Sequence, residues 1–241
     1  MKKHIPNAIT CCNLISGCIA TFYAFQQDFR LAFLFIIIGA VFDFFDGFTA
    51  RLLHVSSPIG KELDSLADDV TFGFAPAAVV YSMLTMALGR TACPVLQSAP
   101  AALVTYLPYV AFLIAAFSAL RLAKFNLDER QTSSFIGLPT PANALFWSAL
   151  AYSLQETEVF AEAWFPVVVT LGIFLSCWLL VAEIPMFALK FKTFAFRPNM
   201  LRYGFILFSL VMLGLLGFGG FSAIIVCYVI CSLVNNKWGN S

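Results

Sequence analysis

Five aspartates lie close together in a chain that is otherwise strongly apolar: Asp43, Asp46, Asp64, Asp68 and Asp69. The first two close one apolar stretch and the other three open the next. A carboxylate inside a bilayer costs about 3 kcal/mol or more, so such residues are usually paired, hydrated or bound to metal, and functional. Only two lysine or arginine residues lie among the five. Ion pairing therefore does not account for the cluster, and we expect a chemical site.

The spacing of four of these residues indicates a metal site. Residues three or four apart share one face of a helix, as Asp43 and Asp46 do on one predicted helix and Asp64 and Asp68 do on the next. Two helices joined by a tight turn would present all four carboxylates across a small gap. Four like charges there require cations, and hard oxygen ligands suit Mg²⁺ or Mn²⁺. Four carboxylates could hold two such ions.

Residues around the aspartates predict a phosphate-bearing ligand. Gly47, Ala50 and Gly60 fall on the same helix faces and leave room for a bulky group such as a nucleotide. Arg51 and Lys61 supply positive charge at the rim, and such side chains bind phosphate oxygens well. The pattern therefore favours a metal and nucleotide site at the junction of two helices.

The composition indicates an integral membrane protein. Of the 241 residues, 61% are hydrophobic and only 11% are charged, against about 25% charged in soluble domains. The net charge of +1 gives no reason to expect nucleic-acid binding. The seven cysteines form no C-x-x-C pair, so we interpret them as reduced, packed thiols. Without a repeat or a long hydrophilic stretch, residues 1–241 are predicted to form one membrane-embedded domain.

Hydropathy predicts an all-α fold with about eight transmembrane helices, since a crossing takes about 20 apolar residues. Only three glycines around position 218 divide the last pair, so seven helices plus a hairpin stays open as an alternative. The predicted helices span about 7–27, 31–53, 64–88, 101–124, 139–155, 161–184, 200–218 and 220–235.

The lysines and arginines predict the orientation, because cytoplasmic loops carry an excess of basic residues. With both termini cytoplasmic, only Arg30 and Arg90 fall outside. The active site is then at the cytoplasmic ends of helices 1–4, in the inner membrane. The twelve basic residues on the inner side are Lys2, Lys3, Arg51, Lys61, Arg121, Lys124, Arg130, Lys190, Lys192, Arg197, Arg202 and Lys237.

The aspartates belong to a longer pattern of eight residues at fixed spacing, Asp43-x2-Asp46-Gly47-x2-Ala50-Arg51-x8-Gly60-x3-Asp64-x3-Asp68. This pattern resembles the signature of the CDP-alcohol phosphotransferase family, the class I CDP-alcohol phosphatidyltransferases. The resemblance implies that the four signature aspartates bind two divalent metal ions. It also implies that Asp68 is the general base that takes the proton of the acceptor alcohol.

Within that family the chain most resembles the bacterial and archaeal phosphatidylserine synthases. The similarity covers roughly residues 5–145, in the stretches PNAITCCNLISG, GKELDSLADDVTFGFAPA, RLAKFN and FIGLPTPANA. It implies transfer of a phosphatidyl group from CDP-diacylglycerol to L-serine, giving phosphatidylserine and CMP. The position after Asp68 is often aliphatic in these enzymes; here it is Asp69, which we interpret as a solvated neighbour.

The resemblance also implies two sets of binding residues. Those for CDP-diacylglycerol are Asn7, Thr10, Asn13, Asp43, Gly47, Ala50, Arg51 and Ser57. Those facing the serine carboxylate or the lipid phosphates are Arg121, Lys124 and Asn126. Helix capping, turn formation and the general bias of basic residues toward the cytoplasm are the structural alternatives for several of these residues.

Three other functions stay open at this point. Another acceptor alcohol, such as glycerol 3-phosphate or an inositol phosphate, would keep the same fold and metal site. A cation carrier would use the intramembrane acids differently, near the membrane midplane. A structural partner would tolerate replacement of the aspartates. The resemblance also leaves a homodimer open beside a monomer.

Overall fold

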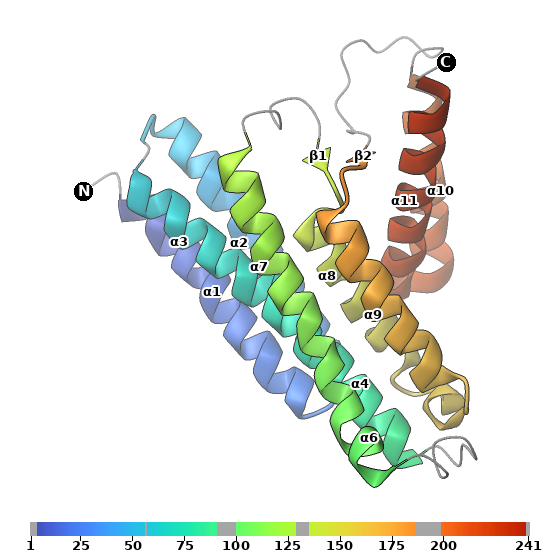
Figure 1. Ribbon diagram of the computed structural model, residues 1–241. Helices are drawn as coiled ribbons and strands as arrows, with labels where there is room; N and C mark the ends of the chain where they lie inside the picture. Colours follow the sequence, from blue (N-terminus) through green and yellow to red (C-terminus); the bar gives the residue numbers. More distant parts are fainter. Residues whose placement is uncertain (1–3, 56, 91–99, 129–134, 187–198, 240–241) are drawn as a thin grey trace.

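The chain folds into long helices that run back and forth between two ends of the molecule, as the computed structural model shows (Figure 1). The structure describes residues 4–55, 57–90, 100–128, 135–186 and 199–239. This arrangement confirms the predicted all-α class. In chain order the elements are α1 His4–Phe25, α2 Phe29–Leu52, α3 Pro58–Asp68, η1 Asp69–Phe74, α4 Ala75–Arg90, α6 Ala101–Tyr106, η2 Leu107–Phe112, α7 Leu113–Leu127, β1 Phe135–Ile136, α8 Thr140–Leu154, η3 Glu158–Ala161, α9 Phe165–Val181, β2 Pro185–Met186, α10 Met200–Leu216, η5 Gly217–Gly219 and α11 Gly220–Gly239.

The third predicted helix begins earlier than expected, at Pro58 rather than near residue 64. The reason is local: Gly60 N donates to Ser57 Oγ at 3.0 Å, which caps the helix, and Pro58 is favourable in the first turn. Directly after Asp68 the path changes to a π-helix, η1, before α4 continues. Such π segments are rare and often occur at functional sites.

Within the described ranges, five stretches are long and apolar enough to cross a membrane. They are 4–25, 29–52, 58–90, 104–127 and 200–234, and the shorter helix α9 is also apolar. The last stretch contains α10 and most of α11, which form an antiparallel hairpin (Figure 1). The protein is therefore a multi-pass membrane protein, and the division into eight crossings stays a prediction.

One end of the bundle gathers the elements that matter for the site. The start of α1, the turn between α2 and α3, the end of α7 and the end of α9 all lie there (Figure 1). The end of α11 lies at the same end, as an even number of crossings requires. Six of the basic residues used to predict the orientation lie outside the described residues: Lys2, Lys3, Arg130, Lys190, Lys192 and Arg197.

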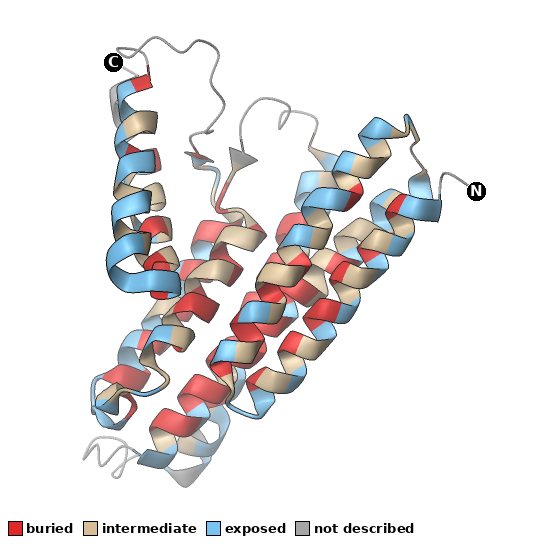
Figure 2. Ribbon diagram, turned by 180° about the vertical axis from the view of Figure 1, so that it is seen from behind, coloured by how far each residue is buried: buried red, intermediate tan, exposed pale blue. Residues whose placement is uncertain are grey.

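Buried residues concentrate between the helices, and exposed residues lie on the outer helix faces (Figure 2). Many of the exposed residues are large and apolar. At the centre, Trp147 of α8 is 2% exposed, and its Nε1 donates to Ser176 Oγ of α9 at 3.0 Å. Outward-facing leucines, phenylalanines and valines on α9, α10 and α11 would be unfavourable in water. Hydrocarbon is the solvent that suits such a surface.

Close packing of α1, α2 and η1 fixes the helices below the aspartates. A Cβ on Gly39 of α2 would lie 2.5 Å from Thr71 Cγ2, and a Cβ on Gly17 of α1 would collide with Thr71 as well. Thr71 Oγ1 in turn donates to the carbonyl of Asn13 at 3.0 Å. Glycine at these two positions therefore allows three backbones to approach one another.

Candidate metal and nucleotide site

Three of the predicted metal ligands converge. One carboxylate oxygen from each of Asp43, Asp64 and Asp68 lies within 4.8 Å of the other two. Asp43 comes from the second half of α2, and Asp64 and Asp68 come from successive turns of α3. The predicted arrangement of two helices that face each other across a gap is therefore present, and this group could hold a metal ion.

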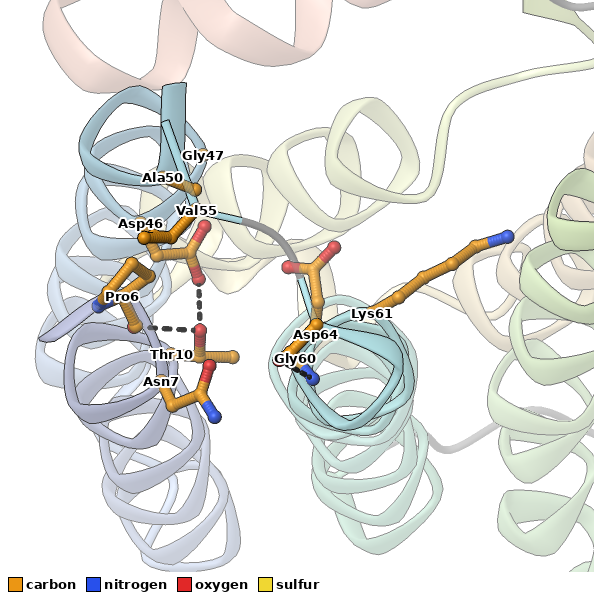
Figure 3. A pocket seen from close by; sticks show the side chains of 11 residues that line it. Pro6, Asn7, Thr10, Asp46, Gly47, Ala50, Val55, Gly60, Lys61 and Asp64 are labelled. Atoms are coloured by element: carbon orange, nitrogen blue, oxygen red, sulfur yellow. Dashed lines mark hydrogen bonds between the residues drawn. The ribbon is translucent and has the colours of Figure 1, made fainter. Parts of the chain in front are cut away.

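The fourth predicted ligand, Asp46, is directed toward α1. Its Oδ2 accepts a hydrogen bond from Thr10 Oγ1 at 2.6 Å, and only 6% of the residue is exposed. Figure 3 shows this contact and shows Asp46 and Asp64 both pointing into the opening between α2 and α3. Asp46 thus lies beside the group of three with one oxygen already bound by a protein donor.

Asn13 orients Asp68 from the side of α1. Its Nδ2 donates to Asp68 Oδ1 at 3.2 Å, and the asparagine is fully buried. The sequence assigned Asn13 to the lipid nucleotide, whereas the structure places its amide on the proposed base. A neutral donor in this position fixes the carboxylate without cancelling its charge.

The acidic group formed by Asp43, Asp64 and Asp68 fits a divalent ion on physical grounds. Two unit charges about 4 Å apart repel by about 4 kcal/mol at an effective dielectric constant of about 20, so three ionised carboxylates need a counter-charge. Asp64 Oδ1 is buried and, within the described part of the chain, has no hydrogen-bond partner. Buried polar atoms are rarely left without a partner. Carboxylate oxygens are the ligands that Mg²⁺ and Mn²⁺ prefer.

A cavity of about 250 Å³ opens beside the acidic group, among α1, α2 and α3 (Figure 3). It contains five residues predicted to bind CDP-diacylglycerol, together with two of the signature aspartates. Its lining residues are Pro6, Asn7, Thr10, Asp46, Gly47, Ala50, Val55, Ser57, Gly60, Lys61 and Asp64.

The signature glycines explain how this cavity forms. A Cβ on Gly60 would lie 2.9 Å from Ser57 Oγ and 3.0 Å from Asn7 Oδ1, so a larger residue here would displace the Ser57 hydroxyl and the Asn7 amide. At Gly47 a Cβ would lie 3.4 Å from Arg51 Nη1. Arg51 lines an adjoining surface hollow with His54, next to the cavity.

The residues predicted to bind the acceptor alcohol or the lipid phosphates lie in two separate places. Arg121 and Lys124 line a groove of about 400 Å³ between α7 and the end of α9. Asn126 instead packs on α3: its Nδ2 donates to Ser65 Oγ at 2.7 Å, and its carbonyl accepts from Lys61 Nζ at 3.3 Å. The contacts of Asn126 are those of a residue that holds α7 against α3.

The interpretation of Asp69 as a solvated neighbour is wrong for one of its oxygens. Asp69 Oδ1 is buried without a hydrogen-bond partner in the described ranges. A Cβ on Gly73 would lie 2.7 Å from this oxygen and 3.0 Å from Ser118 Cβ, which places the oxygen against α7. The π-helical turn begins at Asp69.

Sequence reasoning missed several residues that line the cavity and the groove. Pro6 and Val55 line the cavity, and apolar residues in apolar helices give no signal for this role. Asp128 and Glu183 line the groove with Arg121. A signal existed for Glu183, because it is a lone acid that follows a long apolar run.

Comparison with known proteins identifies the family of the chain. The family model described as CDP-alcohol phosphatidyltransferase matches residues 3–234. The chain belongs to this family. That membership confirms the resemblance predicted from the aspartate signature.

Three relatives of the chain have the same name, CDP-diacylglycerol–serine O-phosphatidyltransferase. The protein of that name from Bacillus subtilis is 38% identical over 143 residues, which are 58% of this chain and 70% of the relative. The one from Mycobacterium tuberculosis (strain H37Rv) is 34% identical over 196 residues, 76% of this chain and 60% of the relative. The one from Saccharomyces cerevisiae is 33% identical over 178 residues, 65% of this chain and 56% of the relative.

Proposed function

We propose that the protein transfers the phosphatidyl group of CDP-diacylglycerol to L-serine, giving phosphatidylserine and CMP. The observation that carries this proposal is the convergence of Asp43, Asp64 and Asp68 within 4.8 Å, beside a cavity whose lining includes the signature residues Asp46, Gly47, Ala50 and Gly60. The shared name of the relatives supports serine as the acceptor.

The cytidine diphosphate part of the substrate would enter the cavity among α1, α2 and α3. Gly47, Ala50 and Gly60 leave space there, and Asn7 and Ser57 offer polar atoms along its wall. Lys61 at the cavity and Arg51 in the adjoining hollow would hold phosphate oxygens.

The acidic group would hold one or two Mg²⁺ or Mn²⁺ ions through Asp43, Asp64 and Asp68, with Asp46 as a fourth carboxylate nearby. When bound, the ions neutralise charge on the diphosphate oxygens and on the leaving CMP. The aspartates bind and orient this centre.

Asp68 would act as the general base. The serine hydroxyl gives its proton to an Asp68 carboxylate oxygen, and the serine oxygen forms a bond to the β-phosphorus. The bond from that phosphorus to the oxygen bridging the two phosphates breaks, and its electron pair leaves with CMP. The hydrogen bond from Asn13 Nδ2 holds the carboxylate in place for this step.

An acceptor panel tests the proposal. Purified protein in mixed micelles with CDP-diacylglycerol and Mg²⁺ or Mn²⁺ is given L-serine, glycerol 3-phosphate or an inositol phosphate, and CMP release is measured. We expect turnover with L-serine, well above that with either phosphorylated alcohol. Turnover with a phosphorylated acceptor and none with L-serine would place the chain in another branch of the family.

We also propose that the whole chain is one membrane-embedded domain whose site opens toward the cytoplasmic face of the inner membrane. The basic residues at the site end, Arg51, Lys61 and Lys124, favour this side. In a variant with the native cysteines replaced, an impermeant maleimide should label Glu158→Cys in intact spheroplasts. It should label Lys61→Cys only after permeabilisation. The reverse labelling pattern would show the opposite orientation in the membrane.

A further inference from the structure

The groove between α7 and α9 is separate from the nucleotide cavity and carries charges of both signs. Its volume of about 400 Å³ is ample for a small amino acid. Two basic and two acidic side chains face it, so their formal charges cancel. Its lining residues are Arg121, Lys124, Phe125, Leu127, Asp128, Ile136, Leu180, Val181, Ala182 and Glu183.

Arg121 connects this groove to the acidic group. It is 7% exposed, lies close enough to Asp68 for a charge–charge interaction, and its Cζ is 5.7 Å from the centre of the Phe125 ring. Arg121 Nε is buried and finds no hydrogen-bond acceptor among the residues that the structure describes. A buried guanidinium with an unused donor is suited to bind a carboxylate.

Glu183 supplies the opposite charge on the other wall, and its backbone position is fixed. Its neighbour Ile184 accepts a hydrogen bond from Gly137 N at 2.9 Å, and β1 pairs with β2 just beyond. Gly137 has a φ of +75°, and a Cβ there would lie 2.8 Å from the Leu180 carbonyl, so glycine alone permits this approach. The acid is exposed at the mouth of the groove.

We propose that this groove binds the acceptor as an α-amino acid zwitterion, with Arg121 holding its carboxylate and Glu183 its ammonium group. The proposal deepens the proposed function, since it assigns acceptor choice to a residue outside the signature and outside the RLAKFN stretch. The phosphate of a phosphorylated alcohol carries one more negative charge than the carboxylate of serine, and Glu183 would repel it. Repulsion of the wrong substrate is a common source of specificity.

Two analogues of serine, each lacking one of its two charged groups, test the two contacts separately. Glycerate has a hydroxyl in place of the ammonium group, and serinol has a hydroxymethyl group in place of the carboxylate. We expect Glu183→Gln to lower kcat/KM for L-serine by about fivefold to tenfold, as for loss of a partly exposed ion pair, and to leave glycerate unchanged. Arg121→Gln should lower turnover of serine by a larger factor than turnover of serinol, because both acceptors lose the positive charge beside Asp68 but only serine loses a carboxylate partner.

A binding measurement checks the same point without turnover. With CMP in place of the lipid nucleotide, radiolabelled L-serine should bind wild-type protein and bind Glu183→Gln several-fold more weakly. The matched control is Glu158→Gln. Glu158 is an exposed acid in η3, shortly before the start of α9, and this variant should bind L-serine like wild type.

The outcomes separate this inference from the proposed function. Equal losses for serine and glycerate in Glu183→Gln, or no loss for serine, would overturn the zwitterion site while leaving phosphatidylserine synthesis intact. If the wild-type protein neither binds nor uses L-serine but does use another alcohol, the proposed function itself fails and the inference fails with it.

Discussion

Asp68→Asn should reduce phosphatidyl transfer at least a hundredfold, because a positioned general base contributes about 10²–10⁴-fold to rate. The carboxamide has nearly the same shape and can still accept from Asn13 Nδ2, but it cannot take the proton of the acceptor hydroxyl. It also replaces one carboxylate oxygen of the group of three with an amide nitrogen, which is a poorer ligand for a hard cation. The rate is measured as CMP release at saturating L-serine and CDP-diacylglycerol.

Asp69→Asn is the matched control for this substitution. The two residues are adjacent, yet the buried oxygen of Asp69 lies against α7, and Asp69 is not a member of the group of three. We expect near wild-type turnover from Asp69→Asn. Stabilisation of both variants by CDP, measured as a Tm shift, should show that nucleotide binding survives. An Asp68→Asn enzyme as fast as wild type would refute the assignment of Asp68 as the base.

Removal of divalent ions should abolish activity, and added Mg²⁺ or Mn²⁺ should restore it. The physical reason is the repulsion among three carboxylates that share a small space with a diphosphate. Activity is followed after dialysis against a chelator, with magnesium or manganese returned in steps.

Manganese binding gives a second readout that does not depend on turnover. Paramagnetic resonance should detect one or two bound Mn²⁺ ions in wild-type protein and a weaker or lost site in Asp64→Ala. Glu62→Gln, an exposed acid on the same helix, should bind like wild type. Full activity in the stripped protein with excess chelator present would exclude a metal centre.

The sequence by itself determined the class of the protein and the core of the site. Its apolar composition indicated a membrane protein, and the i, i+3 and i, i+4 spacing of the aspartates required that they share helix faces. Because these periodicities are local, they identified Asp43, Asp64 and Asp68 before their distances were known. The eight-residue pattern was long enough to indicate the family, which the family model confirms.

Only the tertiary structure decided which side chains meet across helices. It placed Thr10 on Asp46 and Asn13 on Asp68, contacts that span 36 and 55 residues of sequence. It also separated Asn126 from Arg121 and brought Glu183 to the same groove as Arg121. Such contacts depend on how α1, α7 and α9 pack against one another, and no local sequence period encodes that packing.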